Sequence, residues 1–136
     1  MIGILVVTHG ATGEHMLATA AQIVGPAAAQ AAAIGVGLNE DPDAALARAR
    51  AAAALVNDGS GVLVLTDMYG ATPGNVAACL LADGQIEGVA GLSLPMLVRA
   101  LSGREGTLAA AVQRALSGGT EGVVHMNRDS CRNAQR

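Results

Sequence analysis

The chain contains no lysine, no phenylalanine and no tryptophan, and it has a single tyrosine. Without lysine it cannot form a Schiff base or an internal pyridoxal phosphate linkage, and it cannot supply the lysine of a P-loop. Kinases of the P-loop type are therefore excluded. Because aromatic residues are almost absent, we expect an aliphatic core of alanine, valine, leucine and isoleucine. No apolar run approaches the roughly 20 residues that span a bilayer.

Positive charge comes from arginine alone, and the formal net charge of the 136 residues is −3. This balance provides no basic face for nucleic acid and no polybasic segment for a membrane surface. The N-terminus has no basic leader, so we expect a cytoplasmic protein. The cysteines Cys79 and Cys131 are expected to be reduced thiols, with Cys79 on a buried helix face. The length suits one domain, 1–136, and we expect the polar tail 128–136 to be flexible.

Short apolar runs alternate with helical stretches along the whole chain. This alternation predicts the α/β class, with three layers and a mostly parallel sheet. We take the strand order to be 2-1-3-4. Strands are expected near 2–8, 32–36, 62–66 and 86–92. A last short strand, antiparallel and at the edge of the sheet, is expected at 122–126 after a turn at 117–119. Helices are expected at 14–24, from 39–43 to about 57, at 72–82, from Pro95 onward, and at 107–116.

Two of the apolar runs end in a residue that can titrate. The first run ends in His9 and turns at Gly10, and the third ends in Asp67. In the order 2-1-3-4, the connections leave strands one and three in opposite directions, which opens a crevice at their carboxyl ends. We therefore predict that His9 and Asp67 lie together at the mouth of this crevice.

These two residues favour phosphoryl transfer through a histidine. A carboxylate that accepts a hydrogen bond from one imidazole nitrogen fixes the tautomer and raises the basicity of the other nitrogen, and Asp67 would do this for His9. Such transfer depends on positioning and charge neutralisation, so we expect no metal and no cofactor. The groups expected around the phosphate are the hydroxyls of Thr8 and Thr72, the close-approach backbone at Gly10, Gly13 and Gly70, and the helix N-terminus at Thr72-Pro73.

The other titratable residues are given structural interpretations. A lone histidine after a strand is most often a satisfied polar residue, so the hypothesis for His9 depends on Asp67. A metal site of His9, His15 and Asp67 lacks the usual ligand spacing. The segment Gly35-Val36-Gly37 resembles a nucleotide fingerprint without its third glycine, and we discard it. We expect His15 to face solvent, His125 to end an edge strand, and Arg99 and Arg104 to be surface charges.

Three segments resemble the enzyme IIA component of the mannose family of the sugar phosphotransferase system (PTS), and the resemblance covers nearly the whole chain. They are Val7-Thr8-His9-Gly10, Thr66-Asp67-Met68-Tyr69-Gly70-Ala71-Thr72-Pro73-Gly74-Asn75 and Gly91-Leu92-Ser93-Leu94-Pro95-Met96-Leu97. Departures from the family pattern at Ala71, Gly74 and Ser93 bear on partner preference.

The resemblance implies a carrier that works between other proteins. His9 would take a phosphoryl group from the phosphocarrier HPr and pass it to an enzyme IIB for sugar uptake, with Asp67 as the orienting carboxylate. It also implies a homodimer in which the last strand crosses to the partner subunit. Contact with the membrane would be indirect, through the permease components. The segment implied to dock the partners is Leu94, Pro95 and Met96, and Arg99 is expected to face an acidic partner.

Three other functions stay open on the sequence. One is a regulatory module, in which the phosphate state of His9 controls another protein and no sugar moves. A variant is the phosphoryl donor subunit of dihydroxyacetone kinase. The third is a small hydrolase with His9 as its base, although the chain offers no evident serine or cysteine nucleophile.

Overall fold

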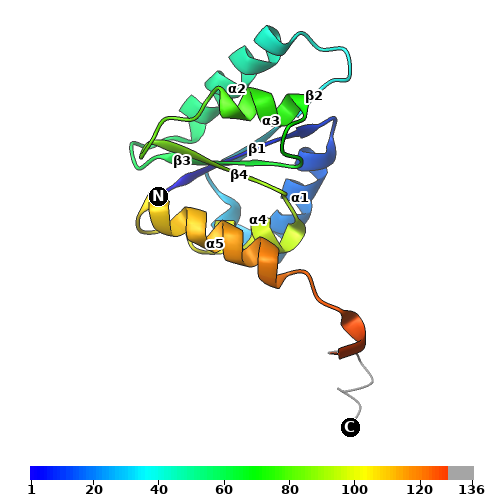
Figure 1. Cartoon of the computed structure of the whole chain (residues 1–136). Helices are drawn as coiled ribbons and strands as arrows, with labels where there is room; N and C mark the ends of the chain where they lie inside the picture. The colour runs from blue at the N-terminus through cyan, green and yellow to red at the C-terminus, as the bar shows by residue number, and fades with distance from the viewer. Residues whose placement is uncertain (129–136) are drawn as a thin grey trace.

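Four parallel strands form the central sheet, in the order β2-β1-β3-β4. The computed structural model describes residues 1–128, and β1 and β3 lie in the middle of the sheet (Figure 1). The strand order expected from the sequence is confirmed. The strands are β1 (Gly3–His9), β2 (Ala31–Val36), β3 (Val62–Thr66) and β4 (Ile86–Ala90).

Helices cover both faces of the sheet and give the three expected layers. Figure 1 shows α2 and α3 on one face and α1, α4 and α5 on the other. Side chains alternate along β1, so Ile4 and Val6 join the core on the second face while Leu5 and Val7 join the core on the first. The helices are α1 (Thr12–Val24), α2 (Pro42–Val56), α3 (Thr72–Ala78), α4 (Leu94–Ser102) and α5 (Leu108–Glu121), with 3-10 segments η1 (Gly25–Ala28) and η2 (Met126–Arg128).

The end of the described chain differs from the expectation. The turn predicted at 117–119 is wrong, because α5 continues through this stretch to Glu121. A Cβ on Gly118 would lie 3.0 Å from the Cβ of Arg99, so the glycine lets α5 pack closely against α4 instead of breaking the helix. Residues 123–125 have no regular structure and Met126 begins η2, so the antiparallel strand predicted at 122–126 is not formed within a single chain up to residue 128.

Two smaller expectations are also corrected. The helix α3 ends at Ala78, and Cys79 after it is exposed instead of buried. Cys131, and the predicted tail from residue 129 onward, lie outside the described residues. Within residues 1–128, no helix is both long and apolar enough to cross a membrane.

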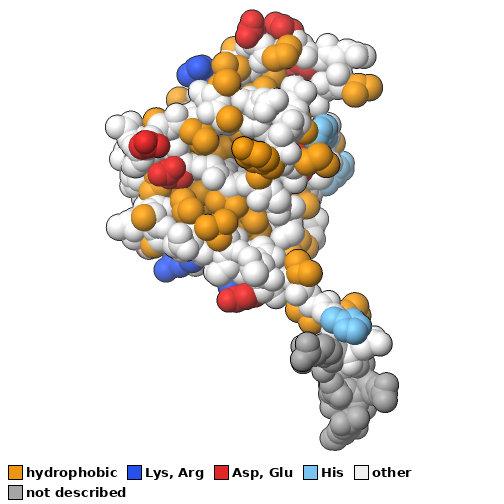
Figure 2. Space-filling model, in the orientation of Figure 1, with side chains coloured by type: hydrophobic (Ala, Val, Ile, Leu, Met, Phe, Trp, Pro, Cys, Tyr) orange, Lys and Arg blue, Asp and Glu red, His pale blue; other side chains and the backbone are white. Residues whose placement is uncertain are grey.

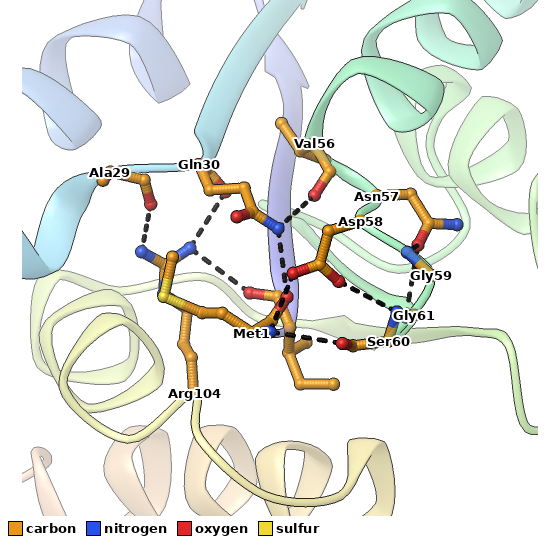
Figure 3. A network of polar contacts seen from close by, with 11 residues as sticks. Met1, Ala29, Gln30, Val56, Asn57, Asp58, Gly59, Ser60, Gly61 and Arg104 are labelled. Carbon is orange, nitrogen blue, oxygen red and sulfur yellow. Dashed lines mark hydrogen bonds and ion pairs between the residues drawn. The ribbon is translucent and has the colours of Figure 1, made fainter.

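Arg104 is buried, so the expectation of a surface charge was wrong. Its side chain is 3% exposed, and it follows α4 at the edge of the sheet opposite the carboxyl ends of the strands. Figure 3 shows its guanidinium among main-chain carbonyl groups of the segments around it. Nη1 donates to the carbonyl oxygen of Gln30 (2.9 Å), and Nη2 donates to those of Ala27 (2.7 Å) and Ala29. One arginine thus donates hydrogen bonds to several main-chain carbonyl groups in η1 and in the connection from η1 to β2.

We expect Arg104→Met to lower the free energy of unfolding by about 2–4 kcal/mol. Methionine keeps much of the length of the side chain, but the carbonyls of Ala27, Ala29 and Gln30 lose their buried donor. Urea denaturation measures the change. Arg50→Met, at an exposed site of α2, is the control and should stay within about 0.5 kcal/mol of the wild type. Equal midpoints for the two variants would contradict a stabilising role for Arg104.

Candidate functional site

His9 and Asp67 meet at the carboxyl ends of β1 and β3. The register pairs Val7 with Thr66, which places the next residues of the two strands at the same edge of the sheet. The Nδ1 atom of His9 lies 2.8 Å from Oδ2 of Asp67. The main-chain N–H of His9 donates to the same oxygen at 3.1 Å. The juxtaposition predicted from the strand order is therefore present.

The electrostatics of this pair fix the roles of the two ring nitrogens. Burial raises the pKa of Asp67, but the hydrogen bonds from the imidazole and main-chain N–H of His9 outweigh it and hold the pKa below its ordinary value of 3.8. An ionised carboxylate can only accept, so Nδ1 carries the proton and Nε2 keeps the lone pair. The imidazole is 51% exposed and the Asp67 side chain is 20% exposed. The histidine ring is therefore open to solvent, while most of the carboxylate behind it is covered.

The side chain of Thr8 lies beneath the His9–Asp67 pair and does not reach the surface of the protein. Its side chain is fully buried, and its hydroxyl oxygen accepts a hydrogen bond from the N–H of Gly13 at 2.7 Å. A Cβ on Gly13 would lie 2.7 Å from Cγ1 of Val6, so glycine is needed for α1 to start this close to β1. This geometry gives Thr8 and Gly13 a part in holding the turn after His9.

A pocket of about 270 Å³ opens beside His9. Gly10 turns the chain there with φ +48°, and Thr72 lies across from it at the exposed start of α3. Gly70 has φ +85° in the exposed loop between β3 and α3, where a residue with a Cβ would be strained, but it does not line this pocket. The lining residues are His9, Gly10, Val36, Gly37, Leu38, Thr72 and Pro73.

Sequence reasoning missed one wall of this pocket. Val36, Gly37 and Leu38 come from the end of β2 and the loop that follows it. A signal was present, because the carboxyl end of a strand beside β1 must lie at the same edge of a parallel sheet as His9. The side chain of Leu38 is 98% exposed, although leucine is apolar.

The segment expected to dock partner proteins is only partly at the surface. Met96 is 3% exposed and packs in the core between α4 and the sheet, so a docking role for its side chain was wrong. The helical period explains the error, since α4 buries one side and Met96 falls on it. Leu94 is half-buried, Pro95 is exposed, and Arg99 forms an ion pair with Glu121.

The remaining histidines lie apart from the acid. His15 is exposed on α1, as expected, and His125 is exposed in the irregular stretch after α5 instead of ending a strand. The histidine side chains visible in Figure 2 lie at the surface. Among residues 1–128, no three histidine, cysteine, aspartate or glutamate side chains are grouped so that they could hold a metal ion.

Comparison with known protein families gives one match over most of the chain. The family model EIIA-man, described as PTS system fructose IIA component, matches residues 3–116. That span includes the strand ends of β1 and β3, the pocket, the whole of α4 and the first part of α5. A comparison with curated proteins gave no match.

Solved structures of PTS components share the fold. The EIIA component from Streptococcus agalactiae is 28% identical and aligns over 94% of this chain and 99% of that one, with a TM-score of 0.80. The mannose/sorbose specific IIA subunit from Enterococcus faecalis is 29% identical over 90% and 92%, with a TM-score of 0.77. The IIA protein associated with the fucose utilization operon of Streptococcus pneumoniae is 24% identical, with a TM-score of 0.80, and shows the fold alone.

Proposed function

Because the chain belongs to the EIIA-man family of PTS IIA components, we propose that it is a phosphohistidine carrier in the cytoplasm. It accepts a phosphoryl group from HPr on Nε2 of His9 and passes it to an enzyme IIB for sugar uptake. The observation that carries this proposal is the contact of 2.8 Å between Nδ1 of His9 and Asp67, which leaves Nε2 as the nucleophile.

The transfer itself needs no group other than the two side chains and the incoming phosphoryl. The lone pair on Nε2 attacks phosphorus, the N–P bond to the donor histidine breaks, and the donor nitrogen takes back its electron pair. Positive charge develops on the imidazole of His9 as the new N–P bond forms, and the carboxylate of Asp67 stabilises this charge through the hydrogen bond from Nδ1. Phosphate delivery to IIB is the same step in reverse toward a different histidine or other nucleophile of that partner. Thr72 and the backbone at Gly10 line the space beside His9 where the phosphoryl oxygens would lie.

HPr and IIB would dock on the exposed loops around His9. Three large side chains in these loops are exposed to solvent: Leu38 is 98% exposed, Met68 59% and Tyr69 89%. Removal of such side chains from water is the main favourable term when two proteins associate. Pro95 and half-buried Leu94 extend the docking surface that the resemblance implies toward α4.

A homodimer with exchanged C-terminal segments is part of the same proposal. Beyond Ile86, which bridges to Ala82, β4 pairs with no other strand on its outer side among the described residues. Figure 2 shows apolar side chains gathered on the face that carries this strand. Beyond α5, Val123, Val124 and Met126 are 84%, 51% and 74% exposed. An apolar segment with this much exposed surface suits an open strand edge of a second copy.

Deletion of all residues after Gly122 tests the exchange. We expect the full chain to run as a dimer in size-exclusion chromatography with light scattering, and the shortened chain as a monomer with the same circular dichroism signal per residue. The reason is that the shortened chain lacks the segment proposed to pair with β4 of the partner subunit. A shortened chain that stays dimeric would place the interface elsewhere.

The carrier function is tested by phosphorylation with purified components. The protein is incubated with enzyme I, HPr and phosphoenolpyruvate, and we expect a phosphate that is stable in base and lost in acid, as a phosphohistidine requires. Omission of HPr should prevent the labelling. A protein that stays unlabelled when HPr itself is phosphorylated would overturn the proposal.

A further inference from the structure

The loop between β2 and α2 is held by an ion pair that none of the chemistry above uses. Arg48 of α2 donates from Nε to Oε2 of Glu40 at 3.0 Å and from Nη2 to Oε1 at 2.8 Å. This is a two-point contact between a guanidinium and a carboxylate, the arrangement that fixes geometry best. Glu40 lies two residues before Pro42, the first residue of α2, so the pair ties the helix to the loop before it.

Both partners also bind the backbone of that loop. Nη2 of Arg48 donates to the carbonyl oxygen of Gly35 at 2.7 Å, and Oε1 of Glu40 accepts from the N–H of Gly37 at 3.0 Å. The two glycines flank Val36, so its position is set from both sides. The hydrogen bonds from Arg48 and from the Gly37 N–H also hold the pKa of Glu40 below its ordinary value of 4.5 and keep this acceptor ionised.

The held segment touches the residue next to His9. Val36 accepts a hydrogen bond from the N–H of Gly10 at 3.0 Å. A Cβ on Gly35 would lie 1.9 Å from the carbonyl oxygen of Gly10, so the two backbones are in direct contact and only glycine fits. This explains Gly35 without any nucleotide motif. A continuous series of contacts therefore runs from Arg48 through Gly35 and Val36 to the turn that carries His9.

We infer that Glu40 and Arg48 are positioning residues for phosphoryl acceptance: together they clamp the β2–α2 loop as the fixed wall of the His9 pocket. The inference rests on the proposed carrier function. Val36, Gly37 and Leu38 form that wall, and Leu38 projects from it almost fully exposed. Such a wall sets how an incoming phosphocarrier seats against His9, while the bond between Nδ1 and Asp67 is made independently of it.

This division of labour predicts a particular kinetic signature. When the clamp is lost, the loop samples several positions, and the ordering of its residues must then be supplied by docking. The KM for phosphorylated HPr should rise about tenfold, while kcat changes less than threefold, because nucleophile and carboxylate remain in place. A residue that merely stabilised the fold would change neither constant below the unfolding temperature.

The experiment measures initial rates of phosphate transfer from phosphorylated HPr to Arg48→Met and Glu40→Gln at several HPr concentrations. Arg50→Met, two residues further along the same helix and exposed, is the matched control and should keep the wild-type KM. The double variant Arg48→Met with Glu40→Gln should be no more than about twofold worse than the worse single variant, because both changes open the same clamp. Amide NMR shifts of Gly10 and Gly37 should move in both single variants and not in the control.

The possible results distinguish failure of the proposed clamp from failure of the proposed carrier function. If the wild type is labelled and Arg48→Met keeps the KM of Arg50→Met, the clamp is overturned and the carrier function stands. If kcat falls while KM is unchanged, the pair acts on the nucleophile and not on the wall, which also overturns the inference. A wild type that accepts no phosphate overturns the carrier function, and the clamp inference falls with it.

Discussion

His9→Ala should abolish phosphate incorporation from phosphoenolpyruvate, enzyme I and HPr. The variant removes the imidazole whose Nδ1 contacts Asp67 and whose Nε2 is the proposed nucleophile. Labelling should fall to the background of a reaction without the protein. Gel analysis after separation at alkaline pH measures it, because phosphohistidine survives base and not acid.

His15→Ala is the matched control for this experiment. His15 is also an exposed imidazole, six residues later on α1, but it has no carboxylate partner within the described chain. Its removal should leave the rate of labelling within about twofold of the wild type. If labelling persists in His9→Ala and disappears in His15→Ala, the acceptor is His15 and the assignment to His9 is wrong.

Asp67→Asn should slow phosphoryl acceptance by about 10- to 1,000-fold while the protein remains folded. Asparagine has nearly the same shape, but its amide can donate to Nδ1, which would place the proton on Nε2 and remove the nucleophilic lone pair. The negative charge that stabilises the imidazole of His9 during the attack is lost as well. Rapid-quench measurement of single-turnover transfer from phosphorylated HPr gives the rate. Asp83→Asn, at an exposed carboxylate elsewhere, should be unchanged.

Acidity should act on this site in two ways. An imidazolium has no lone pair on either nitrogen, so acceptance should fall as the pH is lowered. The folded protein also holds the pKa of Asp67 below 3.8, so the stability that this carboxylate contributes is present above about pH 4 and is lost as the pH falls through the folded value. The difference in unfolding free energy between wild type and Asp67→Asn should therefore shrink below pH 4. A difference that stays constant with pH would show that the ionisation of Asp67 does not contribute to stability.

Much of the fold could be predicted because β1 and β3 are buried on both faces. Their apolar runs end sharply at His9 and Asp67, and the alternation with helices dictates a parallel sheet. The C-terminal part could not be read in the same way. Ser117, Gly118 and Gly119 look like a turn, yet glycine at 118 is used for close helix packing, which depends on α4 and not on the local sequence.

The core of the candidate site was visible in the sequence, and its outer parts were not. The topology brings the ends of β1 and β3 together, so His9 and Asp67 could be paired by reasoning on strand order alone. The hydroxyl of Thr8 suggested a phosphate ligand, but helices cover both faces of β1, so the side chain of Thr8 is buried although it is polar. The burial of Arg104 could not be predicted, because the main-chain carbonyl groups that accept its hydrogen bonds are brought together only by the fold.

The proposed acceptor sits at the end of a central strand whose preceding six residues are entirely buried. We therefore expect the backbone that carries the imidazole to stay in place and not to move between one partner protein and the other. Donor and recipient must each reach the same Nε2 atom, so we expect them to compete for the surface around His9. The relay is consequently expected to follow ping-pong order: empty HPr departs before IIB arrives, and an excess of unphosphorylated HPr inhibits the second half-reaction by simple competition.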